Sequence, residues 1–159
     1  MLLMGCLLLL LAANGMPVLA RRLLGERGAA PIDGGRHFSD GRPWLGESKT
    51  WRGLLAAVLA TAPLGALLGL GWGLGALFGL LSMLGDLLAS FTKRRLGIPP
   101  SGRARLLDQL PEALLPLAVL REPLGLDWTE VVLITAAFTL LEWLVSPWLY
   151  RLRIRRRPY

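Results

Sequence analysis

Four polar residues recur along one apolar stretch of the sequence, and their spacing places them on one face of a helix. Ser82, Asp86, Ser90 and Lys93 follow one another at intervals of four, four and three residues, the spacing of neighbours on a helix surface. The seven residues from Asp86 to Lys93 correspond to about 10 Å along a helix. Ionisable residues inside apolar helices are costly and usually functional, so we expect Asp86 to belong to a functional site.

A carboxylate close to several cations suits a divalent metal ion that holds a polyphosphate. Lys93, Arg94 and Arg95 form a basic cluster at the end of the same stretch. Mg²⁺ is usually held by one or two carboxylates together with substrate phosphates. The sequence therefore predicts a Mg²⁺ site at Asp86, with a structural ion pair between Asp86 and a neighbouring base as the alternative.

A second acidic position opens the next apolar stretch. Asp108 and Gln109 begin this candidate helix, and Glu112 follows Asp108 by one turn. Asp108 is a candidate second metal ligand or general base, and a carboxylate stabilised by the dipole at a helix start is the alternative. Glu142 lies on a polar stripe of the last apolar stretch, where we favour a packing hydrogen bond over a place in the same cavity.

A glycine-rich segment ahead of the second apolar stretch carries a candidate anion site. It contains Asp33 and Gly34, and it ends in Lys49, Thr50 and Arg52 just before a helix is expected to start. Glycines let the backbone approach a ligand, and a helix N-terminus with such donors binds anions. The alternative is a set of basic residues that attract anionic lipid, which we favour for the scattered arginines elsewhere in the chain.

The composition decides what kind of element must position these residues. The chain has 159 residues, of which 53% are hydrophobic and 18% charged, and its formal net charge is +7. Soluble proteins carry fewer apolar and more charged residues. The long runs of Leu, Ala and Gly argue against both a soluble enzyme and a basic nucleic-acid binder, so we expect no nucleic acid as partner. The single cysteine, Cys6, excludes an internal disulfide and a Cys-based metal site.

These runs predict an all-α integral membrane protein with a single domain over residues 1–159. A span needs about 20 mostly apolar residues, and the fourth candidate is short and broken by Pro111 and Pro116. The expected transmembrane helices cover about residues 2–20, 53–70, 71–92, 106–120 and 128–150. Two glycine pairs at a spacing of four, Gly65/Gly69 and Gly75/Gly79, predict close packing between helices.

The distribution of basic residues orients these spans. Lys and Arg concentrate in the loops at 21–52 and 93–105 and in the C-terminal tail, and cytoplasmic loops collect such residues. Five crossings place all three basic segments on one side. We therefore expect the N-terminus outside, the C-terminus in the cytoplasm, and both loops cytoplasmic.

Four sequence blocks, taken together, resemble the CDP-archaeol synthase family, which is related to the CDP-diacylglycerol synthases. The resemblance runs in order over roughly residues 31–120. The blocks are PIDGG at 31–35, SKTWRG at 48–53, GDLLASFTKRRLGI at 85–98 and LDQ at 107–109.

The resemblance implies a five-span membrane cytidylyltransferase of the cell membrane, which couples CTP to a lipid phosphate and releases pyrophosphate. The acceptor would be similar to archaetidic or phosphatidic acid, and the assembly could be a homo-oligomer. Mg²⁺ is implied at Asp86 and Asp108, with Lys93 as a third catalytic residue. The implied substrate-binding positions are Asp33, Gly34, Lys49, Thr50, Arg52, Ser90, Arg94, Arg95 and Gln109.

Three other functions remain as alternatives. A CDP-alcohol phosphatidyltransferase would carry a paired DG…AR…G…D…D pattern on one helix, whereas Asp33-Gly34 and Asp40-Gly41 here lie in an expected loop. A small transporter often shows repeated halves, and the sequence shows no such repeat. A membrane scaffold would not require an acid at Asp86. Binding of CTP in preference to ATP would separate a cytidylyltransferase from the transporter and the scaffold.

Overall fold

The computed structural model describes residues 2–99 and 105–151, with side chains omitted for Arg105 and for 146–151. The described residues form five helices and two isolated β-bridges, which confirms the all-helical class. The helices are α1 (Leu2–Leu24), α2 (Trp51–Leu67), α3 (Trp72–Arg95), α4 (Arg105–Val119) and α5 (Trp128–Arg151). The basic C-terminal tail and part of the second expected loop lie outside the described residues.

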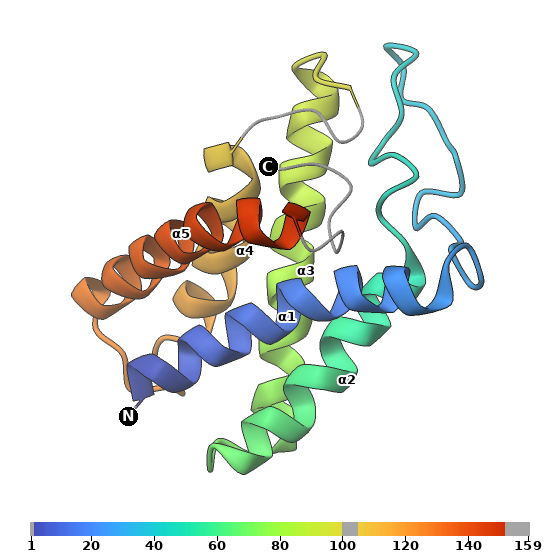
Figure 1. Cartoon of the computed structure of the whole chain (residues 1–159). Helices are drawn as coiled ribbons and strands as arrows, with labels where there is room; N and C mark the ends of the chain where they lie inside the picture. Colours follow the sequence, from blue (N-terminus) through green and yellow to red (C-terminus); the bar gives the residue numbers. More distant parts are fainter. Residues whose placement is uncertain (1, 100–104, 152–159) are drawn as a thin grey trace.

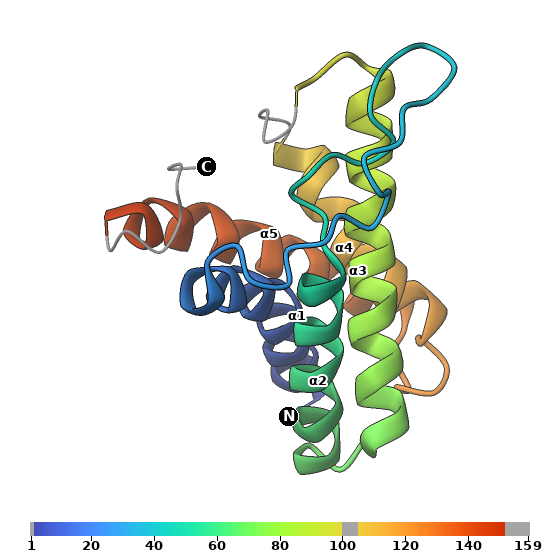
Figure 2. The ribbon, with the colours of Figure 1, turned by 90° about the vertical axis from the view of Figure 1, so that its right-hand side faces the viewer.

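Helix α3 lies at the centre of the bundle. It contacts α1, α2 and α4, while α5 packs against α4 and α1. In Figures 1 and 2, α2 and α3 run antiparallel and side by side, joined by a short turn at one end. A core of apolar side chains from α1, α3, α4 and α5 fills the space between these helices, with Leu9, Phe78, Leu117 and Phe138 each completely buried. The polar stripe predicted on α3 therefore lies inside the bundle.

Glycines bring α2 and α3 into backbone contact, as their spacing predicts. A Cβ atom on Gly65 would lie 2.6 Å from the Cα atom of Gly75, and one on Gly79 would collide with Thr61. Close approach at small residues is a common way to pack apolar helices. Gly69 differs from the prediction, because it lies beyond the end of α2 in the turn, with a φ of +78° and open space around it.

A third glycine, which the pairwise spacing did not identify, brings α3 against α4. A Cβ atom on Gly85 would lie 2.5 Å from the carbonyl carbon of Pro111 and 2.8 Å from the Cα atom of Glu112. Such distances are shorter than real side chains tolerate, so only glycine fits this crossing. The residue after Gly85 is Asp86, and the crossing therefore fixes the position of the candidate metal ligand relative to α4.

Three of the described helices, α1, α3 and α5, are long and apolar enough to cross a membrane. Helix α2 has 17 residues and α4 has 15, with Pro111 and Pro116 inside α4. At 1.5 Å per residue, α4 is only about 22 Å long, which is shorter than a bilayer's hydrocarbon core of about 30 Å. The described helices thus support a multi-pass membrane protein.

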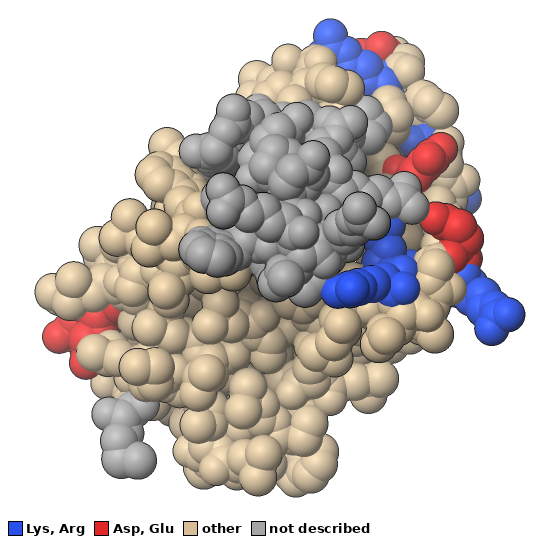
Figure 3. Space-filling view, in the orientation of Figure 1, with Lys and Arg blue, Asp and Glu red and all other residues tan. Residues whose placement is uncertain are grey.

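The segment between α1 and α2 folds back onto the end of α3. Arg95 contacts Asp40 at 2.7 Å and donates to the carbonyl oxygen of Pro43 at 2.6 Å, and its guanidinium lies 4.6 Å from the Phe38 ring centroid. Arg42 donates in turn to the carbonyl oxygen of Arg95 at 2.6 Å. The two expected cytoplasmic loops are therefore adjacent, and Figure 3 shows Lys and Arg gathered toward this side of the molecule.

The helix ends differ from the predicted ones in a way that matters for the site. Helix α3 continues through Arg95, so the Lys93–Arg95 cluster forms its last turn instead of the start of a loop. The helix stops at Leu96 because the next residue, Gly97, adopts a left-handed φ of +76°. Helix α2 starts at Trp51, two residues earlier than predicted, because Thr50 caps it.

Candidate active site

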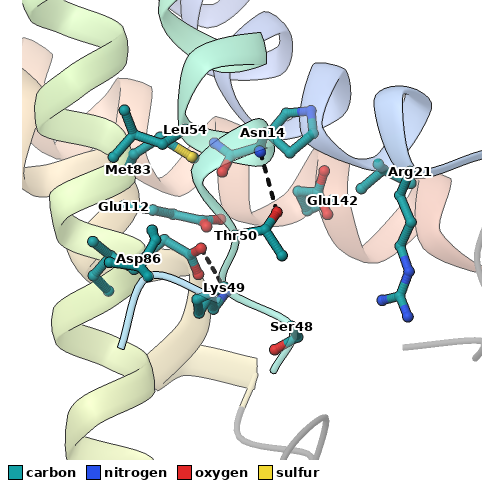
Figure 4. A pocket seen from close by; sticks show the side chains of 15 residues that line it. Asn14, Arg21, Ser48, Lys49, Thr50, Leu54, Met83, Asp86, Glu112 and Glu142 are labelled. Atoms are coloured by element: carbon teal, nitrogen blue, oxygen red, sulfur yellow. Dashed lines mark hydrogen bonds and ion pairs between the residues drawn. The ribbon is translucent and has the colours of Figure 1, made fainter. Parts of the chain in front are cut away.

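A cavity of 260 Å³ lies where α1, α3, α4, α5 and the start of α2 converge. Figure 4 shows polar side chains pointing into it from α1, α3, α4 and α5 and from the segment before α2. The polar lining residues are Asn14, Arg21, Ser48, Lys49, Thr50, Asp86, Glu112 and Glu142. Residues from distant parts of the sequence, and from three of the four sequence blocks, therefore meet here.

Lys49 and Asp86 form the central contact of this cavity. The Nζ atom of Lys49 lies 2.5 Å from Oδ2 of Asp86, and the two side chains are 20% and 18% exposed. Burial by itself lowers the pKa of Lys49, but the Asp86 carboxylate, together with Glu112 and Asp108, outweighs that effect and holds the pKa above its ordinary value. The ammonium therefore stays charged, and the ion pair considered as an alternative for Asp86 is formed with Lys49.

Local backbone structure holds Lys49 in this place. The carbonyl oxygen of Lys49 accepts a hydrogen bond of 2.8 Å from the backbone N–H of Ile32, and Thr50 forms a β-bridge with Pro31. The hydroxyl of Thr50 accepts from the backbone N–H of Gly53 at 3.2 Å, which caps α2. The PIDGG and SKTWRG blocks thus form one unit, and Thr50 both caps the helix and lines the cavity.

Asp108 lies in a different contact from Asp86. Its carboxylate pairs with Lys93, whose side chain is only 8% exposed, and Asp108 does not line the cavity. Within the described residues, no group of three or more His, Cys, Asp or Glu side chains is close enough to hold a metal ion by itself. The structure therefore places the two predicted metal ligands in separate ion pairs, Asp86 with Lys49 and Asp108 with Lys93.

Two of the arginines expected to bind phosphate make contacts that organise the loop. Arg52 donates to the carbonyl oxygens of Gly25 and Arg27 at 2.9 and 2.5 Å. Arg95 holds the loop onto α3, as described above. Arg94 is 3% exposed, and its Nε has no hydrogen-bond partner among the described residues.

Asp33 organises the same loop from within. Its carboxylate accepts hydrogen bonds from the backbone N–H groups of Gly35, Leu45 and Gly46 at 3.0, 2.9 and 2.9 Å. Partial burial raises the pKa of Asp33, but these donors together lower it below its ordinary value. Gly34 supplies the left-handed turn beside it, with a φ of +57°. In this structure both residues shape the loop and neither lines the cavity.

Ser90 and Gln109 complete the set of predicted residues. Ser90 is 2% exposed and lies on the buried face of α3 with Ser82 and Lys93. Gln109 accepts a hydrogen bond of 2.6 Å from Nε1 of Trp143, which joins α4 to α5. Neither residue lines the cavity.

Five polar lining residues were absent from the predicted site: Asn14, Arg21, Ser48, Glu112 and Glu142. Ser48 was part of the SKTWRG block, Glu112 was named only as a neighbour of Asp108, Glu142 was interpreted as a packing residue, and Asn14 and Arg21 were not singled out. The side chain of Asn14 donates to the carbonyl oxygen of Leu10 at 3.0 Å and approaches Ser82 at 3.5 Å. A polar residue inside an apolar run was the available signal for Asn14 and Glu142, but that signal does not specify which way the side chain faces.

A second cavity of 440 Å³ adjoins the first. The two share Pro17, Arg21, Ser48, Thr50 and Gly53 in their lining. Glu26, Glu47 and Arg52 line the second cavity only. The shared residues join the two cavities into one polar region. The first cavity is its carboxylate-rich part between the helices, and the second lies under the segment between α1 and α2.

Comparison with known proteins extends the likeness to the whole chain. The sequence profile of a family described as CarS-like, CDP-archaeol synthase, matches residues 1–159. The CDP-archaeol synthase of Thermococcus onnurineus is 32% identical over 92% of this chain and 89% of its own length, and that of Sulfurisphaera tokodaii is 36% identical over 84% of each. The CDP-archaeol synthase of Hyperthermus butylicus is 42% identical over a shorter match, which covers 63% of this chain and 60% of that protein.

A solved structure gives the same assignment for the fold. It belongs to an intramembrane enzyme for the biosynthesis of archaeal membrane lipids, and it matches this chain with a TM-score of 0.69 and 32% identity. The match covers 87% of this chain and 90% of that one. With the profile match over its full length and these relatives, the chain belongs to the CDP-archaeol synthase family.

Proposed function

We propose that this protein is a membrane cytidylyltransferase, which couples CTP to a lipid phosphate to give a CDP-activated lipid similar to CDP-archaeol. Family membership supports the class of reaction. The single structural observation that carries the proposal is the meeting of Lys49 and Asp86 in one polar cavity inside an apolar bundle. Each comes from a separate block, and polar groups inside a membrane protein usually mark a functional site.

The residues of the cavity fit a divalent cation. Asp86 supplies carboxylate oxygens, the ligands that Mg²⁺ prefers in proteins, and a bound nucleotide would supply phosphate oxygens. When bound there, Mg²⁺ would neutralise charge on the phosphates. Asp86 remains our first candidate ligand, and Asp108 would contribute only if its pair with Lys93 opened.

The reaction is an in-line substitution at phosphorus. An oxygen of the lipid phosphate forms a bond to the α-phosphorus of CTP, the bond from that phosphorus to the α,β-bridging oxygen breaks, and pyrophosphate leaves with the electron pair. A phosphate monoester is already anionic at neutral pH, since its second pKa is about 6. No strong base is needed, and this chain contributes by positioning and charge stabilisation.

Different side chains of the two cavities would bind different anionic groups of the substrates. Lys49 would reach phosphate oxygens in the cavity once its pair with Asp86 opens, since its ammonium is charged and its backbone is held by Ile32. Arg21 lies between the two cavities and can bind a second anionic group. The lipid acceptor would enter from the bilayer and the nucleotide from the loop side.

We further propose that all five helices cross the cell membrane, with the N-terminus outside and the basic loops in the cytoplasm. The distribution of Lys and Arg supports this orientation. The segment between α1 and α2, residues 25–50, contacts the end of α3. This contact also supports the orientation, because it keeps two of the basic segments on one side. Reaction of single introduced cysteines with an impermeant reagent, in a Cys6→Ala background, tests each loop.

The activity is tested with the purified protein in detergent. We expect Mg²⁺-dependent release of pyrophosphate from CTP when an archaetidic or phosphatidic acid is present, and no release with ATP. Asp86→Asn should lower the rate by about 100-fold or more, as removal of one charge-stabilising group does in other enzymes. Glu122→Gln is the matched control, because that carboxylate is 84% exposed and lies outside the cavity. Undiminished activity of Asp86→Asn would contradict the role assigned to Asp86.

A further inference from the structure

Glu112 is a buried carboxylate in the cavity that the predicted chemistry does not use. Its residue is 8% exposed, and its side chain points into the space between the helices (Figure 4). It forms no hydrogen bond or ion pair within the described part of the chain. A buried, charged carboxylate without a partner is strongly unfavourable, so Glu112 needs a proton, a cation or a hydrogen-bond donor at this position.

The crossing of α3 and α4 places Glu112 next to Asp86. Gly85 lies in backbone contact with Pro111 and Glu112, and Asp86 and Glu112 are each at or beside that contact. Both carboxylates line the same cavity. Asp108, one turn earlier on α4, faces Lys93 instead. The pair that the fold brings together is therefore Asp86 with Glu112.

The charged groups that face Glu112 favour a bound cation beside it. Asp86 and Lys49 are its neighbours from α3 and from the segment before α2, and Glu142 faces it from α5. Arg21 lies on α1 at the junction with the second cavity. Among the described residues, Asp86 and Glu112 face the same buried ammonium of Lys49, and that ammonium contacts only Asp86 of the two.

We propose that Glu112 and Asp86 together ligate the divalent cation that accompanies the nucleotide, and that Lys49 competes with this cation for Asp86. Two carboxylates from adjacent helices are the usual protein share of a Mg²⁺–polyphosphate site. When the cation takes Asp86, the Lys49 ammonium is released toward the nucleotide phosphates. This inference rests on the proposed function and names a ligand that the sequence motifs did not.

The test measures metal binding apart from catalysis. Mn²⁺ binding to the purified full chain is followed by electron paramagnetic resonance, with and without CTP, for wild type and five variants. Glu112→Gln and Asp86→Asn should each weaken Mn²⁺ binding at least tenfold. Glu122→Gln, an exposed carboxylate elsewhere, should leave it unchanged. Lys49→Met should bind Mn²⁺ more tightly than wild type without CTP, because it removes the competitor.

Two results would overturn the proposal. One is a Glu112→Gln affinity within twofold of wild type under both conditions, and the other is a Lys49→Met affinity equal to or weaker than that of wild type. Glu112→Asp retains the charge and guards against a folding artefact, since it should bind Mn²⁺ at least threefold more tightly than Glu112→Gln. Mn²⁺ binding that needs Glu112 in a protein that transfers no cytidylyl group would refute the proposed function and leave this inference standing.

Discussion

Replacement of Gly85 by alanine would test whether the crossing of α3 and α4 builds the site. The added Cβ atom would stand 2.5 Å from the carbonyl carbon of Pro111 and 2.8 Å from the Cα atom of Glu112, where ordinary contact begins at 3.4 Å. Both neighbouring atoms belong to backbone and cannot rotate away. The two helices would have to separate by more than about 0.9 Å, because the carbonyl oxygen of Pro111 stands nearer still and well-packed interiors do not absorb an extra carbon.

The magnitude follows from two opposing effects. Overpacking of this kind costs about 1–3 kcal/mol, and alanine regains about 0.5–1 kcal/mol over glycine inside a helix. We expect a net loss of stability of about 1–2 kcal/mol. The effect on activity should be larger, because the same shift moves Asp86 away from Glu112. A misplacement of about 1 Å can cost about 100-fold in rate.

The assay combines thermal unfolding in detergent, followed by circular dichroism, with cytidylyl transfer from labelled CTP. Gly15→Ala is the matched control, because Gly15 lies inside α1 and has no atom within 4 Å of an added Cβ. That variant should be unchanged or about 0.4–1 kcal/mol more stable. If Gly85→Ala melted as high as Gly15→Ala and retained full activity, the packing argument would be refuted.

Two further predictions concern the 25–50 segment. The hydrogen-bonded Asp33 carboxylate should contribute its full stabilisation above its ordinary pKa of 3.8. That stabilisation should be lost as the pH falls toward the lowered pKa that Asp33 has in the folded protein. Between pH 6 and pH 2.5 the unfolding temperature should therefore fall less in Asp33→Asn than in wild type, and parallel curves would contradict this. Arg95→Gln loses the contacts to Asp40 and Pro43, so limited proteolysis should cut this segment several-fold faster than in the control Arg121→Gln, which changes an arginine on the connection between α4 and α5. Equal rates would show that Arg95 does not hold the loop.

Much of the fold could be predicted because each helix is encoded locally. Apolar runs of about 20 residues indicated four of the five helices to within a few residues, and a shorter run broken by Pro111 and Pro116 indicated α4. The close packing between α2 and α3 could also be predicted, since a small residue at every fourth position marks a contact face whatever its partner. The largest error in a helix end that affects the site is at Lys93–Arg95, where the basic cluster suggested a loop but forms the last turn of α3.

The candidate site could be predicted only in part, because spacing along one helix says nothing about its neighbours. The stripe on α3 correctly placed Asp86 and Lys93 inside the bundle. It did not show that they belong to two separate ion pairs. The prediction that Asp86 and Asp108 share a metal ion remains untested, and their separate partners make Glu112 the stronger second candidate.

The sequence by itself determined the environment and the chemical class: an apolar bundle, a basic side, and polar residues whose presence in such helices is too costly to be incidental. Only the tertiary structure decided which of those residues meet. The crossing at Gly85 selects Glu112 over Asp108 as the neighbour of Asp86, and the folded 25–50 segment delivers Lys49 into the helices. Both depend on backbone contacts between segments far apart in the chain, and no local pattern of residue types records how closely two such segments approach.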